Sequence, residues 1–282
     1  MEIFLDGRES KGKGRNKYQK FFPLSKPSFC NYVHRYIVWK FPANRKRCTV
    51  KPILQAADVL KKYRLGSQVV SVLNGITLGV FPGEIVAILG TSGCGKTTFL
   101  NIAAGLERPT GGDIVINGHN LNKISEQNMA AFRRRYIGFV FQLYNLIPSL
   151  TALENATLPL VFEGIPPAQR EKRGRVLLQK MGLGDRLGHK PNELSGGQRQ
   201  RVSLARAMIN NPRIIFADEP TGNLDSRTTE EILRLLISSV REMKQTLLLV
   251  THDLDVAAYG DRIVEMVDGS IVRERTVSVP LK

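Results

Sequence analysis

The chain has 282 residues, of which 42% are hydrophobic, and a formal net charge of +16. This size and apolar content suit one large α/β domain with a subdomain, and no apolar run approaches the ~20 residues of a membrane-spanning helix. Three cysteines fit neither a metal-ligand spacing nor a disulfide framework and indicate a reducing compartment; they are Cys30, Cys48 and Cys94. We therefore expect a soluble or peripheral protein.

The positive charge is concentrated in residues 1–52, which we predict to be a basic, flexible N-terminal extension. Residues 1–51 hold 13 Lys or Arg and 3 acidic residues, with aromatic residues between them. Such a pattern suits an anionic membrane surface or nucleic acid. Four interpretations remain open: an ordered arm that contacts lipid headgroups or a membrane partner, a flexible tail without a specific role, an organelle transit peptide, and a misplaced start codon.

A phosphate-binding motif follows an apolar run at residues 84–89, which is typical of a buried parallel strand. Residues 90–97 read Gly-Thr-Ser-Gly-Cys-Gly-Lys-Thr and fit the pattern Gly-x-x-x-x-Gly-Lys-Thr. Backbone N–H groups of the loop and the start of a helix over residues 97–105 would surround phosphate oxygens. Lys96 would reach the β- and γ-phosphates, and Thr97 would bind Mg²⁺. The predicted nucleotide-binding residues here are Gly90, Thr91, Ser92, Gly93, Cys94, Gly95, Lys96, Thr97 and Thr98.

Cys94 lies within this loop, where a helix N-terminus and Lys96 both favour the thiolate. Two interpretations remain open. Alkylation or oxidation of Cys94 blocks ATP binding, or the position requires only a small side chain.

Two further apolar runs end in candidate catalytic side chains. Residues 213–217 precede Asp218 and Glu219, and residues 246–251 precede His252. Asp218 would hold the Mg²⁺ shell, and Glu219 would accept a proton from the attacking water. Because α/β sheets bind ligands at the carboxyl ends of their strands, we expect Gly90, Asp218 and His252 to share one crevice.

A second anion-binding helix start is predicted at residues 194–198, which read Leu-Ser-Gly-Gly-Gln and precede a helix through Met208. Ser195 would cap the helix or donate its hydroxyl, while Gly196 and Gly197 expose N–H groups. Other predicted helices cover residues 151–160, 166–181 and 227–243, and Asp268-Gly269 predicts a β-hairpin within residues 264–272.

With these motifs the chain resembles the nucleotide-binding subunit of ABC transporters over roughly residues 53–275. The resemblance implies an α/β fold: a RecA-like P-loop NTPase core with an antiparallel β subdomain and an inserted α-helical subdomain. We predict a cassette at 53–282, with the core at 53–142 and 211–275 and the helical subdomain, which contains the signature, at 143–210.

The resemblance also implies ATP and Mg²⁺ as cofactors and a head-to-tail homodimer. In that dimer Ser195, Gly196, Gly197 and Gln198 of one subunit would face the nucleotide bound to the other. Three more roles are implied: Gln142 senses Mg²⁺ and water, His252 senses the γ-phosphate, and Asp225 lies in the loop that crosses the dimer interface. Tyr63 would stack on adenine; an ordinary half-buried tyrosine is the alternative.

Within the family the chain is most similar to ATPases of the macrolide-export, lipoprotein-release and cell-division group. The shared strings are Asn145-Leu-Ile-Pro148, residues 151–155, residues 158–160 and Pro220-Thr-Gly-Asn-Leu-Asp225. This similarity implies an ATPase at the cytoplasmic face of the plasma membrane that drives separate integral membrane permease subunits, for export or for lipoprotein, peptide or macrolide release. Candidates for the permease-binding groove, with core packing as the alternative, are Leu143, Leu146, Ile147 and Leu150.

Two non-transport functions remain as alternatives. The first is ATP-driven signalling in cell division or envelope remodelling through a permease-like partner. The second is a clamp on nucleic acid. Only one cassette is present, and the 51 residues between Gln142 and Leu194 leave no room for long coiled coils, so no specific nucleic acid is expected.

Overall fold

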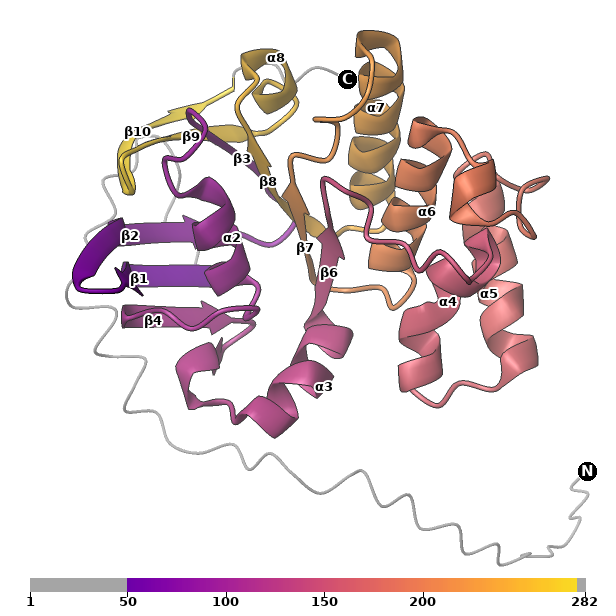
Figure 1. Ribbon diagram of the computed structural model, residues 1–282, viewed down its shortest axis with the longest axis horizontal. Helices are drawn as coiled ribbons and strands as arrows, with labels where there is room; N and C mark the ends of the chain where they lie inside the picture. Colours follow the sequence, from indigo (N-terminus) through magenta and orange to yellow (C-terminus); the bar gives the residue numbers. More distant parts are fainter. Residues whose placement is uncertain (1–49, 278–282) are drawn as a thin grey trace, which may run out of the picture. The chain divides into compact units, whose positions relative to one another are not determined.

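The computed structural model describes residues 50–277, which form two β-sheets and a separate group of helices (Figure 1). The larger sheet has the strand order β10-β9-β3-β8-β7-β6. Its strands are parallel except for β10, which pairs antiparallel with β9. They are β3 (Ile85–Leu89), β6 (Ile137–Val140), β7 (Ile214–Asp218), β8 (Thr246–Thr251), β9 (Arg262–Val267) and β10 (Ser270–Thr276).

The parallel strands are apolar on both sides because both faces of the larger sheet are covered. Side chains along β7 and β8 alternate between two cores. Phe216 and Leu248 belong to a core that includes α2 (Lys96–Ala103). Ala217 and Leu249 belong to a core formed with α6 (Gly196–Met208) and α7 (Ser226–Glu242). The strands are thereby fixed from both sides, which holds their carboxyl ends in register.

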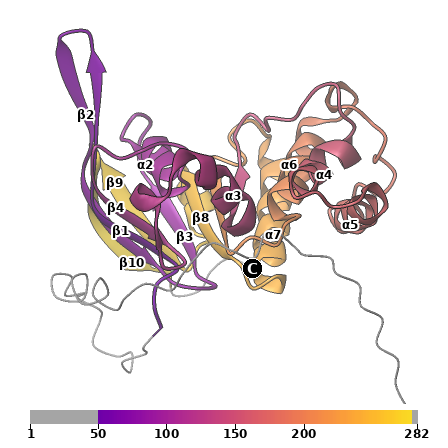
Figure 2. The ribbon, with the colours of Figure 1, turned by 90° about the horizontal axis from the view of Figure 1, so that it is seen from below.

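The smaller sheet is antiparallel, with the order β2-β1-β4-β5, and shares its core with α2. Figure 2 shows the hairpin of its two longest strands extending beyond the rest of the sheet. The register of that hairpin shifts near Asp58, which has a positive φ of 49°. The strands are β1 (Leu54–Leu65), β2 (Gln68–Val80), β4 (Gly111–Ile116) and β5 (His119–Asn120).

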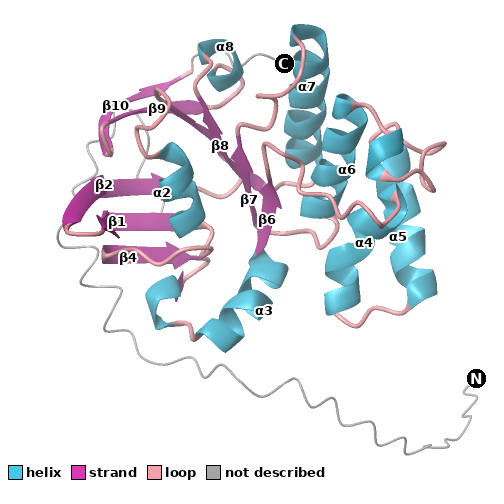
Figure 3. Cartoon of the chain, in the orientation of Figure 1, coloured by secondary structure: helices cyan, strands magenta, loops and turns pink. Residues whose placement is uncertain are grey.

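The helices α4, α5 and α6 gather beyond the β6 edge of the larger sheet (Figure 3). Capping boxes begin two of them: Thr151 with Glu154 at α4, and Ser195 with Gln198 at α6. In the described range, 50–277, no helix is both long and apolar enough to span a bilayer. The other helices are α3 (Glu126–Tyr136), α4 (Ala152–Phe162), α5 (Pro167–Lys180), α8 (Leu254–Ala257) and the 3-10 turns Leu121–Lys123 and Pro191–Glu193.

The helices predicted over residues 151–160, 166–181 and 227–243 correspond to α4, α5 and α7, with ends displaced by one or two residues. The predicted extension at residues 1–52 lies outside the described residues except for its last three, as do Cys30 and Cys48. Its proposed lipid contact therefore stays a prediction.

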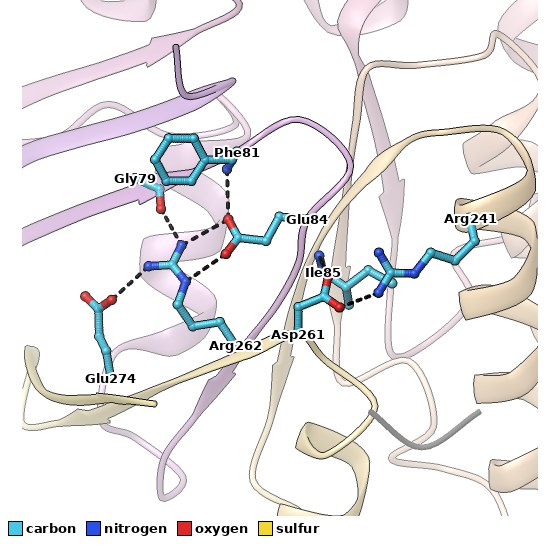
Figure 4. Close-up of polar contacts among 8 residues, drawn as sticks. All are labelled: Gly79, Phe81, Glu84, Ile85, Arg241, Asp261, Arg262 and Glu274. Carbon is cyan, nitrogen blue, oxygen red and sulfur yellow. Dashed lines mark hydrogen bonds and ion pairs between the residues drawn. The ribbon is translucent and has the colours of Figure 1, made fainter. Parts of the chain in front are cut away.

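A polar network joins the two sheets and α7 at the amino ends of β3 and β9 (Figure 4). Arg262 contacts Glu84 at 2.9 Å and Glu274 at 2.8 Å, and it also donates to a backbone carbonyl of β2. The adjacent Asp261 pairs with Arg241 of α7 at 2.5 Å. This network lies at the edge opposite to Gly90, so it stabilises the sheet that carries the site without taking part in it.

Candidate functional site

Four neighbouring parallel strands bring the predicted site residues to one edge of the larger sheet. Gly90 follows β3, His252 follows β8, Asp218 ends β7, and Gln142 comes two residues after β6. The carboxyl ends of parallel strands form the ligand-binding edge of an α/β sheet. Gly90, Asp218 and His252 therefore lie at one edge of the sheet, and Glu219 joins them from the turn after β7.

The loop between β3 and α2 curls tightly because two of its glycines adopt left-handed conformations. Gly93 has φ of 80° and Gly95 has φ of 100°. A Cβ on Gly95 would lie 2.8 Å from the carbonyl oxygen of Val72, so a larger residue would force the loop away from β2. Helix α2 starts immediately after this turn, and its free N–H groups and positive dipole face the loop.

Lys96 supplies a cationic centre held inside this loop. Its side chain is buried, and Nζ donates to the carbonyl oxygens of Gly90 at 2.9 Å and Thr91 at 2.8 Å. An ammonium group in such a position is preorganised for an anion, because phosphate oxygens can take the place of the two carbonyl acceptors.

Thr97 and Asp218 form an oxygen-rich pair beside the loop. The Thr97 hydroxyl donates to Asp218 Oδ1 at 3.0 Å. Burial raises the pKa of the Asp218 carboxyl above its ordinary value, and neighbouring Glu219 raises it further, while Thr97 and Lys96 oppose the rise. A hydroxyl and a carboxylate match the oxygen ligands that Mg²⁺ prefers beside phosphates. These two residues could hold that ion.

Glu219 and His252 face each other across the crevice. Glu219 has a positive φ of 41°, and its side chain is largely buried, with Oε1 lying 3.1 Å from His252 Nδ1. Gln142 borders the same glycine as Glu219: a Cβ on Gly222 would lie 2.9 Å from Gln142 Nε2 and 3.4 Å from Glu219 Oε2. Glu219 thus contacts His252 directly and shares Gly222 as a neighbour with Gln142.

A cavity of about 570 Å³ opens at this point. Its walls combine the phosphate-binding loop with the Glu219–His252 pair. The lining residues are Leu89, Gly90, Thr91, Ser92, Glu219, His252 and Leu254. Leu89 and Leu254 are not among the site residues predicted from the sequence. Each lies within two residues of a predicted site residue, Gly90 or His252, and this closeness is the signal that could have identified them.

Tyr63 lies near the start of α2 but outside this cavity lining. Its hydroxyl donates to Glu107 at 2.9 Å, and it also interacts with Thr98. Burial, followed by Glu107, raises the pKa of the Tyr63 phenol. The Lys61 ammonium lies 4.9 Å from the ring centroid. The ring is therefore oriented by its neighbours before any ligand binds.

The Leu-Ser-Gly-Gly-Gln motif forms a helix start at a distinct place in the chain, where Ser195 is exposed, the next three residues are half-buried and Leu194 is buried. Ser195 Oγ accepts from the backbone N–H of Gln198 at 3.2 Å, and Gln198 Oε1 accepts from Ser195 N–H at 2.9 Å. Gly197 packs close to Thr228, whose N–H donates to Asp225 at 3.0 Å. None of these residues lines the cavity at the phosphate-binding loop. The two predicted phosphate-binding helix starts thus lie at separate places in the chain.

The comparisons with known proteins agree with this arrangement. Residues 73–222 match the family model described as ABC transporter. An uncharacterised ABC transporter ATP-binding protein of Thermotoga maritima is 50% identical over 222 residues, which are 79% of this chain and 94% of that protein. The chain belongs to the ABC transporter family.

Two further relatives place the chain within this family as its ATP-hydrolysing cassette. The dimeric cassette MJ0796, in a post-hydrolysis state bound to ADP and Pi, superposes with a TM-score of 0.75 at 43% identity, covering 80% of this chain and 99% of that one. The macrolide export ATP-binding/permease protein MacB of Brucella melitensis is 47% identical over 225 residues; they are 80% of this chain and 35% of that protein. The predicted P-loop NTPase fold is confirmed, and the chain spans about a third of the MacB proteins it matches.

Cys94 of the cassette is buried, with 4% of its surface exposed. Its sulfur fills the space beside Gly90, where a Cβ would lie 2.7 Å from Sγ. The thiol therefore packs beneath the loop, and this burial favours the interpretation that the position requires a small side chain.

Proposed function

We propose that two copies of this cassette bind two Mg-ATP between them, head to tail, at the cytoplasmic face of the plasma membrane. Closure and hydrolysis then drive a separate integral membrane permease that exports or releases a macrolide, peptide or lipoprotein. The dimeric form of the cassette MJ0796 supports the dimer. The name of the MacB relatives, ATP-binding/permease protein, supports a permease partner.

Nucleotide binding is assigned to the loop and its flanks. The N–H groups of residues 90–95 surround the phosphates, and Lys96 binds the β- and γ-phosphate oxygens. Tyr63 stacks on adenine beside Thr98, which is compatible with a ring already oriented by Glu107. A bound Mg²⁺ would neutralise the phosphate charge that develops during transfer; Thr97 and Asp218 would hold it, and Gln142 is a third candidate ligand.

Hydrolysis is assigned to Glu219, which orients the attacking water or accepts its proton. Its 3.1 Å contact with His252 fixes the carboxylate, and His252 then reaches toward the γ-phosphate from the rim of the cavity. Gln142, bordering Glu219 at Gly222, responds to the same ligand. Together these three residues detect whether the γ-phosphate is present.

The position of the start of α6 is the observation that supports the proposed dimer most directly. Ser195, which is exposed, caps the start of α6, and the two glycines after it lie against Tyr144, Leu224 and Thr228, whereas the phosphate-binding loop precedes α2. A helix start of this kind is suited to the phosphates of a second subunit. Asp225, which caps α7 next to Gly197, would then lie at the interface.

The permease is proposed to contact the surface that follows Gln142. Leu143 and Ile147 are exposed by 73% and 38%, whereas Leu146 packs against the helical core. Leu143 and Ile147 are therefore the stronger candidates for the groove, because only exposed apolar side chains gain buried surface on docking.

The partner is tested by purification of a tagged Glu219→Gln variant with Mg-ATP from gently solubilised membranes, compared with a Lys96→Ala control. We expect one multi-span protein to be retained by the first variant alone, identified by mass spectrometry. Retention of nucleic acid, or of no membrane protein, would contradict the proposal.

A further inference from the structure

The segment after Gln142 contains two consecutive residues in the left-handed region. Tyr144 has φ of 61° and Asn145 has φ of 47°. Residues other than glycine rarely adopt this backbone conformation. Tyrosine has no short polar side chain that could stabilise it by a local hydrogen bond. The surrounding structure must therefore hold this segment in place.

Arg206 of α6 holds it through the backbone. Nη2 donates to the carbonyl oxygen of Tyr144 at 2.6 Å, and Nη1 donates to that of Asn145. A planar guanidinium can satisfy two adjacent carbonyls at once, which an ammonium cannot do with the same geometry. Burial lowers the pKa of Arg206, but an arginine in a protein stays charged at neutral pH.

The same helix also contacts the Tyr144 side chain. Arg199, seven residues before Arg206, places its guanidinium carbon 5.4 Å from the Tyr144 ring centroid and donates to the Leu194 carbonyl oxygen at 3.2 Å. A Cβ on Gly196 would lie 3.3 Å from the Tyr144 hydroxyl. The first turn of α6, through Arg199, thus contacts the Tyr144 ring. Two turns further along the helix, Arg206 binds the Tyr144 carbonyl oxygen.

We propose that Arg206 is a positioning residue that ties the segment after Gln142 to the signature helix. Gln142 is two residues from Tyr144, and Ser195 caps the helix that carries Arg206. A displacement of Gln142 by nucleotide in one subunit then moves Ser195, which serves the nucleotide of the partner subunit. The inference rests on the proposed function, because it assigns the route by which one ATP site reports to the other.

The test compares Arg206→Met with Arg201→Met in the full chain carrying Glu219→Gln. Arg201 is on the same helix, but it donates to the Met181 carbonyl oxygen and to Glu231, away from the segment after Gln142. Two quantities are measured: the affinity of the dilute monomer for a fluorescent ATP analogue, and the ATP concentration that gives half-maximal dimer by light scattering.

We expect Arg206→Met to leave the monomer affinity within about twofold while raising the half-maximal ATP concentration about tenfold or more. Arg201→Met should change neither. If Arg206→Met does not fold, Arg206→Lys serves in its place, since it keeps the charge but not the planar fork. Equal dimerisation of the Arg206 and Arg201 variants, or an equal loss of monomer affinity and dimerisation, overturns the inference.

Failure of the Glu219→Gln parent to dimerise with ATP would instead refute the proposed function. The coupling between the segment after Gln142 and the start of α6 is then measured in the monomer by amide hydrogen exchange. ATP should slow amide exchange in residues 142–147 and 194–199 of the parent, but only in residues 142–147 of Arg206→Met. The same response of both segments in the variant overturns the inference independently of dimer formation.

Discussion

The Thr97 hydroxyl lies 3.0 Å from Asp218 Oδ1, although 121 residues separate the two in the chain. The contact arises because α2 starts at the end of β3 and Asp218 ends β7, and a single strand, β8, lies between these two. Parallel pairing therefore turns two distant motifs into one site. The consequences can be tested residue by residue.

Replacing Lys96 with Ala should abolish tight ATP binding. The buried ammonium is the cation that the loop holds for the phosphates, and losing its charge-assisted contacts should weaken binding about 10- to 100-fold. Isothermal titration calorimetry measures the change, with Lys62→Ala on β1 as the control. Unchanged affinity of the Lys96 variant would remove this residue from the site.

Replacing Asp218 with Asn should stabilise the nucleotide-free protein at pH 7. The pKa of Asp218 is raised above 3.8, mainly by burial, so between 3.8 and the raised value the folded chain binds more protons than the unfolded chain. The stability contributed by the protonated Asp218 carboxyl is fully present below pH 3.8. It is lost as the pH rises through the pKa of the folded state, so at pH 7 the site holds a buried carboxylate. The gain in Tm should shrink on acidification.

The same Asp218 variant should lose the extra stabilisation that Mg²⁺ adds to ATP, because a neutral amide is a weaker ligand for a hard cation. Differential scanning calorimetry measures both effects: the Tm of the nucleotide-free variant, and the change in Tm that Mg²⁺ causes in the presence of ATP. A lower Tm of the nucleotide-free variant at pH 7 would contradict the first expectation.

Replacing His252 with Ala should slow hydrolysis while leaving nucleotide affinity within about twofold. The imidazole fixes the Glu219 carboxylate at 3.1 Å, and misplacing a catalytic base costs about 100-fold or more in kcat. Phosphate release is compared with that of His189→Ala, whose ring contacts Arg186 in the helical region. Wild-type turnover in the His252 variant would dismiss its role.

Replacing Arg262 with Met should destabilise the fold without affecting nucleotide affinity. Its largely buried guanidinium pairs with Glu84 and Glu274, and removing one partner of a buried pair costs about 3–5 kcal/mol. Arg275→Met is the matched control on β10, since its more exposed pair with Glu265 should contribute at most about 1 kcal/mol. Urea unfolding distinguishes the two, and equal losses would contradict the account.

Much of the fold could be predicted because its signals are local. The apolar run at 246–251 became the fully buried β8, and Asp268-Gly269 forms the β9–β10 turn with φ of 43° and 75°, as a tight hairpin requires. The helices α4 and α6 each start directly after the N-cap residue of a capping box. In each case the residue type itself determines the backbone conformation.

Other features left no pattern in the sequence. The contact of Arg206 with the carbonyls of Tyr144 and Asn145 uses backbone acceptors, which every residue possesses. The pairing of Arg262 with Glu84 spans 178 residues and depends on strand order, which single-residue patterns do not encode. The sequence motifs identify candidate phosphate-binding residues, whereas these tertiary contacts hold the segment after Gln142 and the opposite edge of the sheet in place.

The central claim, a site completed by the partner subunit, is tested most directly by mixing two defective chains that both carry Glu219→Gln. One also carries Lys96→Ala, and the other carries Ser195→Arg, which blocks the helix start. In a head-to-tail dimer of the two, one site keeps both an intact Lys96 and an intact Ser195. We predict that only the mixture retains ATP in a dimer on gel filtration, with one nucleotide per mixed dimer. A mixture that retains no more nucleotide than either chain alone would contradict the account.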